Sequence, residues 1–587
     1  MVTFRVGDQT VSEKQACDYF DAVWMESDEY WRTKVKPDWE QNDRLYQEDI
    51  VAPADKLDWQ SDVRIPVADS LVTRLVNFFN RILVSTNEDY FTVKLPNKDK
   101  QQAYKELLKA RLRIAEFPNK AFHPAMSRGL LNSVYVNKVC RNLKEFSYPD
   151  YDGETGKYSV VRETKASTEI EAPSPKNIRL DPLGDRYLIE ILPVIPLHEF
   201  EEMGKLNGWK NVRKVVDSIV THTDNAKEER PSSENESPYL RTVNLKILYT
   251  RALTDDKGSV LVRDAKIYIA NNKHVLWVEK NILPGGQFPY VVQNPIASIY
   301  GRYGRAYISK IKSLIVSYIE AINLALDGFR LSALGIYEYD IEVMSKDTGH
   351  LFTAVLEPGR FYPKAGQGRG INGVFNNSLQ SAGALQIVFF LDRELQNKSF
   401  QNEFFQGAPT VKGRPTLGEI SIKTQESSAF FTDIATHIER NILTPVLYLT
   451  LVTDLIYLDD VRGGDLLENI SDDAVKGYIR SLTFSERMED VRNMSIEVTG
   501  ISGKIKRLSN FNKLIQILSV LGNVPGVMSA VRSDQLVKKL FEITDDTPDE
   551  VFDMQMLPAL AEQALAQQQQ VPQQPGGMES MGLPIGG

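Results

Sequence analysis

Residues 304–333 read GRAYISKIKSLIVSYIEAINLALDGFRLSA, and this stretch carries the strongest structural pattern in the chain. Its large apolar side chains recur every three or four residues, which is the period of one face of an α-helix. The recurring residues are Ile308, Ile311, Ile315, Tyr318, Ile322, Ala325 and Phe329. The opposite side is polar, with Lys310, Glu320 and Arg330. The stretch therefore predicts a long helix whose apolar seam packs against another helix.

On the N-terminal side of this helix the sequence predicts a mixture of helices and strands. Apolar periodicity predicts one or two helices within 11–48 and further helices at 67–83, 99–116, 121–144 and 196–222. Runs rich in β-branched and aromatic residues predict strands at 90–95 and 158–170. Residues 241–293 alternate in short strand-like runs, with hairpin signals at Asp255–Gly258 and Asn271–Asn272.

The C-terminal side is expected to be mostly helical after two strands, which gives a fold of the α+β class that is mainly helical. The expected strands are 335–343 and 351–362, and the expected helices are 378–403, 416–443, 446–457, 473–481, 504–521 and 534–543. Pro445 is expected to end or kink the helix that starts near residue 416. Residues 561–587 are rich in Gln, Pro and Gly and are expected to be disordered.

The composition places limits on function. Of 587 residues, 42% are hydrophobic and 25% are charged, as in soluble globular proteins. A net charge of −9 argues against a protein that binds nucleic acid by neutralising many phosphates over a broad basic surface. Cys17 and Cys140 cannot form a disulfide framework, so we expect a reducing compartment and synthesis in the cytoplasm. No secretory signal and no membrane span are expected, because the longest uncharged apolar stretch, Leu514–Val531, contains glycine and proline.

Catalytic motifs are missing from the sequence. It contains no P-loop, zinc-protease, nucleophile-elbow or Cys-x-x-Cys pattern, and its six histidines are scattered. We therefore expect no enzymatic activity, no cofactor and no metal. One alternative stays open, because Glu338, Asp340 and Glu342 fall at alternate positions of an expected strand. They could hold divalent ions in a metal-dependent nucleic-acid enzyme, or form a solvated strand face.

Two glycine-containing segments carry local positive charge. Gly301–Arg305 lies at a strand-to-helix transition, where it could hold a phosphate or simply form a sharp turn. The loop 407–415 contains Lys412, Gly413 and Arg414 between two long expected helices. It could be a plain connector or a loop that projects from the body.

The order of these elements resembles that of portal (head-to-tail connector) proteins of short-tailed, podovirus-like bacteriophages. The resemblance covers about residues 50–560 and rests on four features. They are Phe288-Pro289-Tyr290 through Tyr300-Gly301-Arg302-Tyr303-Gly304 before the long helix; the G-x-P-x-x-x-G-R-P-T-L-G-E run that opens 407–443; Trp59-Gln60-Ser61 and Pro66 before the 67–83 helix; and the Gln- and Pro-rich tail.

The resemblance implies a portal-type subunit with wing, stem, clip and crown regions. The implied map is wing, 1–195; first stem helix, 196–222; β-rich clip, 239–293; second stem helix, 303–333; wing again, 334–460, with a channel loop at 407–415; helical crown, 461–560; and tail, 561–587.

The resemblance also implies a function without catalysis. About twelve copies would form a ring at one vertex of the virion capsid, between capsid and tail, and conduct double-stranded DNA during packaging and ejection. Implied partners are the packaging motor (terminase), a tail adaptor protein and the major capsid or scaffolding protein. Ile308, Ile311, Ile315, Tyr318, Ile322 and Phe329 would form the inter-subunit seam, and Arg302, Arg305, Lys310 and Lys312 a basic ring. An oligomeric scaffold that does not conduct DNA is a further alternative.

Overall fold

The structure is a computed structural model. It describes residues 2–49, 56–84, 90–152, 157–221, 241–299, 301–335, 337–340, 361–364, 371–373, 378–399, 433–460, 466–470 and 472–498. These residues combine helices and strands, which confirms the α+β class. The chain divides into two compact units, Met1–Val498 and Thr499–Gly587. The second unit lies outside the described residues, and with it the helices predicted at 504–521 and 534–543 and the tail.

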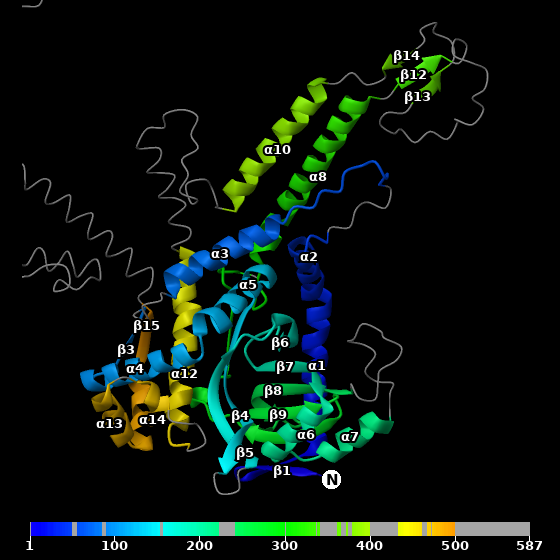
Figure 1. Cartoon of the computed structure of the whole chain (residues 1–587). Coiled ribbons are helices and arrows are strands. Elements are labelled where there is room, and N and C mark those ends of the chain that lie inside the picture. Colours follow the sequence, from blue (N-terminus) through cyan, green and yellow to red (C-terminus); the bar gives the residue numbers. More distant parts are fainter. Residues whose placement is uncertain are drawn as a thin grey trace, which may run out of the picture. The chain divides into compact units, whose positions relative to one another are not determined.

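The largest sheet of the first unit has five antiparallel strands (Figure 1). In spatial order they are β10 (His274–Lys280), β9 (Val260–Ala270), β8 (Thr242–Thr254), β7 (Tyr187–Pro196) and β6 (Ile178–Leu180). Asn271 and Asn272 adopt φ angles of +49° and +59° in the turn between β9 and β10. Tight hairpin turns need this left-handed backbone, and asparagine tolerates it, so the predicted hairpin is confirmed.

Both faces of this sheet are covered. Side chains alternate along each strand, so Leu188 and Tyr249 enter one core while Ile189 and Leu248 enter the other. Helix α1 (Glu13–Tyr30) packs on the second face, where the hairpin of β1 and β2 also contributes to the core. Strand β1 spans Thr3–Val6 and strand β2 spans Gln9–Ser12. The sheet is therefore a two-sided core.

This sheet corrects the position predicted for the clip. The clip was expected as a separate module at 239–293. Instead β8 pairs with β7, from Tyr187 opposite Thr250 to Pro196 opposite Thr242. The residues between 241 and 280 therefore share one sheet and two cores with the N-terminal part of the chain.

The single stem helix predicted at 196–222 is also wrong. Two helices, α6 (Leu197–Leu206) and α7 (Val212–Thr221), occupy this segment. Between them Gly208 has φ +65°, a conformation that ends a helix. Phe200 of α6 and Val215 of α7 are buried in the core beneath the sheet. The segment therefore covers the sheet.

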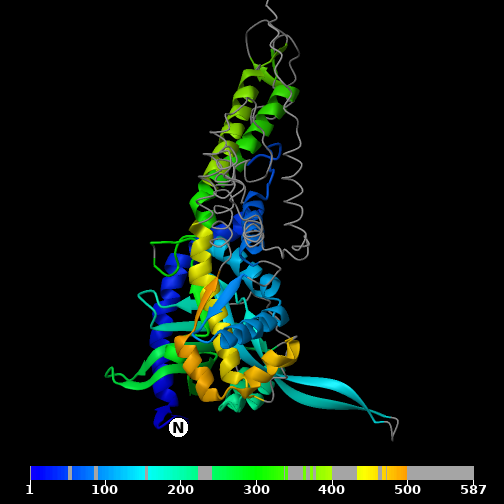
Figure 2. The same ribbon diagram turned by 90° about the vertical axis from the view of Figure 1, so that its left-hand side faces the viewer.

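A second sheet has three antiparallel strands in the order β11-β4-β5. β4 (Tyr135–Asp152) and β5 (Lys157–Glu171) run together as a long two-stranded ribbon (Figure 2), and β11 (Tyr290–Gln293) lies on the other edge of β4. The helix predicted at 121–144 is confirmed only as far as Asn132, because α5 (His123–Asn132) ends at Ser133, which has φ +64°, and strand β4 follows.

Three helices contain a π-turn shortly before a proline. The turns η1 (Trp31–Val35), η2 (Pro118–Phe122) and η7 (Glu439–Leu443) each close with an N–H that donates to the carbonyl five residues back. Pro37, Pro124 and Pro445 follow these turns after one intervening residue, and each is the second residue of its helix: α2 (Lys36–Tyr46), α5 and α12 (Thr444–Tyr457). Proline lacks the N–H and its ring crowds the carbonyl four residues back, which a wider turn accommodates. The helix therefore does not end at Pro445.

The start of the predicted crown at residue 461 is wrong as well. β15 (Ser495–Val498) pairs with β3 (Phe91–Lys94), so the chain returns to its N-terminal part up to Val498. Helices α13 (Asp473–Ser481) and α14 (Phe484–Asn493) come before β15, and α4 (Lys98–Ile114) follows β3. Lys100 and Tyr104 on α4 both donate to the Asp490 carboxylate on α14.

The remaining elements include two long antiparallel helices with a small sheet between them in the sequence (Figure 1). Helix α8 (Tyr307–Leu334) confirms the helix predicted at 304–333, and α10 (Ser378–Lys398) lies beside it. The connecting residues include the sheet β13-β12-β14, with bounds Phe361–Lys364, Tyr337–Asp340 and Ile371–Gly373. Helix α3 (Val67–Leu83) packs on α5 and α8, and short 3₁₀ turns span Pro175–Asn177, Pro284–Gly286 and Leu466–Asn469. Within the described residues, none of the helices combines the length and hydropathy that crossing a bilayer requires.

Candidate inter-subunit and DNA-facing surfaces

The N-terminal half of α8 is already buried inside one chain. Ile308, Ile311 and Ile315 have relative exposures of 0%, 3% and 1%. The same half is tied to α2, because Ser309 donates to the Asp38 carboxylate at 2.6 Å. The prediction that these three isoleucines form an inter-subunit seam is therefore wrong, because their packing partners belong to the same chain.

The helical neighbour that the seam requires is α10 of the same chain. The Tyr307 hydroxyl at the start of α8 donates to the Ser399 carbonyl just after α10, at 3.0 Å. Further along, burial raises the pKa of Tyr318, and the negative charge of the nearby Asp392 carboxylate adds a smaller increase. Asp392, Leu395 and Ser399 fall on one face of α10, which therefore faces α8. Of the other predicted seam residues, Tyr318 and Ile322 are half-buried and Phe329 is 41% exposed.

The rest of this helix pair leaves large apolar side chains in solvent. They are Leu324, Leu326, Phe329 and Leu334 on α8 and Leu385, Ile387, Phe389 and Phe390 on α10. Ile387 and Phe390 are 56% and 62% exposed, and by the helical period they lie on the side of α10 opposite Asp392. Leu324 is 68% exposed. Large exposed apolar patches are uncommon on monomeric soluble proteins.

An extended segment, residues 57–66, lies along α8 and is held by three side chains of that helix. The side-chain amide oxygen of Asn323 accepts from the Val63 N–H at 2.8 Å, and the Asp327 carboxylate accepts from the Ser61 N–H at 2.6 Å. Arg330 donates to the Trp59 carbonyl at 2.5 Å. Alternate residues of the segment thus meet successive turns of one helix face. We call residues 57–66 the strap.

Two of the four predicted ring cations form ion pairs within the chain. Arg302 donates to the Asp185 carboxylate at 2.7 Å, and Lys312 donates to that of Asp38 at 2.7 Å. Burial would raise the pKa of Asp38, but hydrogen bonds from Lys312 and Ser309 outweigh this effect and lower it. Lys312 is therefore not free to neutralise phosphates, whereas Arg302 shares the Asp185 carboxylate with Arg251.

The other two predicted ring cations, Arg305 and Lys310, form no ion pair with any described residue. Arg305 donates to the Ser309 carbonyl at 3.2 Å, and its charge helps to lower the pKa of the nearby Asp38. Burial lowers the pKa of Lys310, and the neighbouring positive charge of Arg305 lowers it further. The local positive charge expected here is therefore carried by two residues at the start of α8.

The segment Gly301–Arg305 has the geometry of a sharp turn. Gly301 and Gly304 both have φ +57°. A Cβ atom at Gly304 would lie 2.6 Å from Cγ of Asn294, so only glycine fits. Tyr303 between them is buried in the core. The glycines therefore introduce α8 and seat Tyr303, which favours the turn interpretation over a phosphate site.

Several predicted site residues lie outside the described residues. These are Glu342, which belongs to the carboxylate trio, and Lys412, Gly413 and Arg414 of the channel loop. Glu338 and Asp340 both lie in β12, as the strand prediction required. Across the described ranges, no three His, Cys, Asp or Glu side chains are grouped as a metal site would need.

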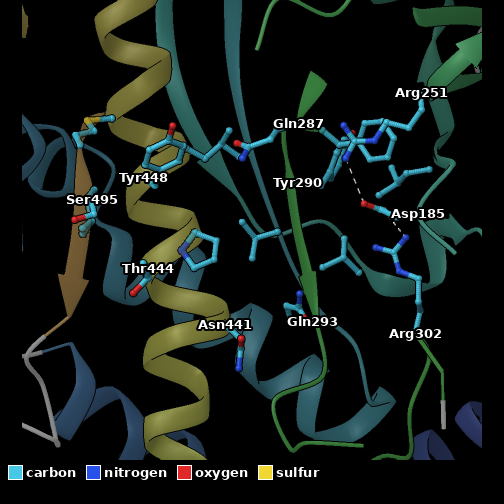
Figure 3. A pocket seen from close by; sticks show the side chains of 18 residues that line it. Asp185, Arg251, Gln287, Tyr290, Gln293, Arg302, Asn441, Thr444, Tyr448 and Ser495 are labelled. Carbon is cyan, nitrogen blue, oxygen red and sulfur yellow. Dashed lines mark hydrogen bonds and ion pairs between the residues drawn. The ribbon is translucent and has the colours of Figure 1, made fainter. Parts of the chain in front are cut away.

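A cavity of about 580 Å³ lies between β11, α12 and β15. Figure 3 shows Tyr290 and Gln293 of β11, with Asn441, Thr444 and Tyr448 of the helix on one side. On the other side, Asp185 lies between the guanidinium groups of Arg251 and Arg302 (Figure 3). The sequence analysis missed this cavity. Its only local signal is Pro289 before β11, since proline is confined to the edges or first residues of sheet strands.

Neither the known protein-family models nor the curated proteins contain a match to this chain.

Proposed function

We propose that this chain is the subunit of a phage portal ring, which sits at one capsid vertex of the virion and conducts double-stranded DNA. The observation that carries the proposal is the pair α8 and α10, with a small sheet between them in the sequence and exposed apolar side chains along both helices. The proposal also rests on the sequence resemblance described above.

The helix pair leads us to assign the stem and the clip to different residues from those expected from the sequence. A portal-type subunit places its clip between two stem helices. Residues 196–222, 239–293 and 303–333 do not have this arrangement, because the first two belong to the five-stranded sheet and its cover. Helix α8, the sheet β13-β12-β14 and helix α10 do have the order helix, β module, helix. We assign α8 and α10 as the stem and the residues between them as the clip.

The exposed apolar residues fit a ring contact between copies. In a ring, each subunit uses two different surfaces, one toward each neighbour. Leu324 lies on α8, and Ile387 and Phe390 lie on the side of α10 that faces away from α8, so one hairpin offers two separate apolar patches. A neighbour's hairpin would cover them.

The charge distribution suits a channel through which DNA slides. Twelve copies would carry about −108 in total, which repels DNA except where local cations project. Arg305 and Lys310 of each subunit supply such cations, while Lys312 is paired with Asp38 and Arg302 shares the Asp185 carboxylate with Arg251. A packaging motor, a tail adaptor and the capsid or scaffolding protein are the partners that this role requires, and no catalytic step is assigned to the chain.

Native mass measurement of the full chain and of two variants tests the assembly. We expect Phe390→Glu to prevent ring formation while the chain keeps its thermal stability, because Phe390 is exposed in the single subunit. Leu183→Glu is the matched control, since Leu183 is 81% exposed but lies between β6 and β7. A full-length chain that stays monomeric or dimeric at every concentration, or rings that form normally with Phe390→Glu, would contradict this assembly surface.

A further inference from the structure

Strand β11 has one edge that no described strand occupies. It pairs with β4 on one side, with Val291 opposite Asn137, and it is the outermost strand of its sheet. The Val139 N–H donates to the Pro289 carbonyl at 2.8 Å. In an antiparallel pair the backbone bonds alternate, so residues 289, 291 and 293 direct their N–H and C=O groups toward β4. Tyr290 and Val292 direct theirs toward the other edge.

The next residue in this alternation shows what lies on that edge. The carbonyl of Asn294 is 3.0 Å from Nε2 of His437, which lies on the helix that continues into η7 and α12. The helix therefore meets β11 at its end. Tyr290 and Val292 line the cavity together with Asn441 and Thr444.

The backbone groups on this edge are both buried and unpaired. Tyr290 and Val292 are each 8% exposed, yet among the described residues nothing hydrogen-bonds to their edge-facing N–H and C=O groups. Buried backbone groups are almost always paired, with protein or with ordered water, so these groups are available to a segment that enters the cavity. An added strand is the partner that satisfies a whole edge at once.

The side chains around the cavity show which strand would fit. Gln287, Gln293 and Ser495 line it, and none of the three side chains hydrogen-bonds to any described residue. At one end two guanidinium groups, those of Arg251 and Arg302, share the single carboxylate of Asp185. This end keeps a net positive charge, which favours a carboxylate on the incoming segment. The volume lies within the usual range of ligand sites.

We propose that the cavity is a docking groove for an extended acidic segment of a partner protein. The segment adds a strand to the free edge of β11, hydrogen-bonds to Tyr290 and Val292, and places a carboxylate beside Arg251 and Arg302. The proposal does not rest on the portal function, because it follows from the strand edge and the lining alone.

Binding of a labelled peptide to the full chain tests the proposal. The probe is a short acetylated peptide of alternating threonine and valine that ends in glutamate, and its counterpart that ends in lysine. We expect the glutamate peptide to bind about tenfold more tightly than the lysine peptide at low salt. Val292→Pro removes the N–H that faces the cavity and replaces a buried valine side chain with one of similar size, so it should weaken binding about tenfold, the loss of one hydrogen bond, and leave the pairing with β4 intact.

Two further variants keep the test decisive. Val292→Thr retains the N–H and should bind the glutamate peptide within about twofold of wild type. Arg251→Gln should remove the preference for the glutamate peptide over the lysine peptide. If Val292→Pro lowers the unfolding temperature, the result with Arg251→Gln decides whether the proposal holds. Absence of binding at millimolar concentration, equal binding of the two peptides, or wild-type binding by a stably folded Val292→Pro protein overturns the proposal. Ring formation is measured separately and has no bearing on these outcomes.

Discussion

At the scale of single residues, a buried ion pair holds the C-terminal helices to the first half of the chain. Arg111 on α4 donates to Asp454 on α12 at 2.9 Å, and their side chains are 8% and 1% exposed. Arg111 also donates to the Thr168 carbonyl of β5 at 3.2 Å. One guanidinium group therefore joins helix α4, strand β5 and helix α12.

Removing one partner of this pair should be costly. We expect Asp454→Ala to lower the free energy of unfolding by about 3–5 kcal/mol, because Arg111 would remain buried without a counter-charge. Urea unfolding measures the change. The matched control is Glu497→Ala, which removes the exposed pair of Lys94 and Glu497, where the side chains are 57% and 56% exposed. The control should lose less than about 1 kcal/mol. Similar losses in the two variants would show that burial does not set the strength of the pair.

The contact between Asp38 and Lys312 should depend on pH. Its hydrogen bonds lower the pKa of Asp38 below the ordinary value of 3.8, so the carboxylate stabilises the fold at any pH above that value. This contribution is lost as the pH falls through the lowered pKa. We expect Asp38→Asn to reduce the urea midpoint near neutral pH and to match wild type at strongly acidic pH. A difference that persists unchanged in acid would contradict the role of the carboxylate charge.

The charges in this region also show which property of single residues the sequence does not predict, namely their ion-pair partners. The sequence places Arg302, Arg305, Lys310 and Lys312 within one short stretch, and that clustering is real. It cannot show that Asp185 and Asp38, each more than a hundred positions away, form ion pairs with two of them. Ion pairing depends on the folded arrangement, so local charge patterns overestimate the free positive charge.

At the scale of elements, local periodicity predicted the strongly amphipathic helices. Helices α3, α4, α8 and α10 lie close to their predicted bounds, because their seams recur within neighbouring turns. The errors at 121–144 and 196–222 arose where one residue reverses the backbone, at Ser133 and Gly208. The helix that passes Pro445 shows a different effect. A π-turn before the proline lets the helix continue past a residue that usually ends helices.

The strap offers a test of how α8 is positioned. We expect Asn323→Ala to increase hydrogen exchange at the Val63 amide about tenfold, because that amide donates to the Asn323 side chain. Hydrogen exchange of the folded chain measures it, with β7 and β8 as internal references. Glu320→Ala, an exposed change on the same helix, is the control. Unchanged exchange at Val63, or the same increase with Glu320→Ala, would show that α8 does not hold the strap.

At the scale of the whole molecule, the predicted map failed where distant segments pair. β8 joins β7 across the residues between them, and β15 joins β3 from about four hundred positions away. Nothing in the composition of 239–293 or 461–498 distinguishes a separate module from strands and helices that complete an earlier sheet or core. The seam of α8 was predicted correctly as a helix contact, but its partner lies in the same chain, since a periodic pattern does not identify the molecule that covers it.

Electron microscopy of the purified full-length chain tests the central claim most directly. If α8 and α10 form the stem of a portal subunit, negatively stained particles should be rings with a central hole. Their mass should be about 800 kDa, twelve times the 66.4 kDa chain. Particles without a central hole, or only monomers and dimers across the concentration range, would contradict the account.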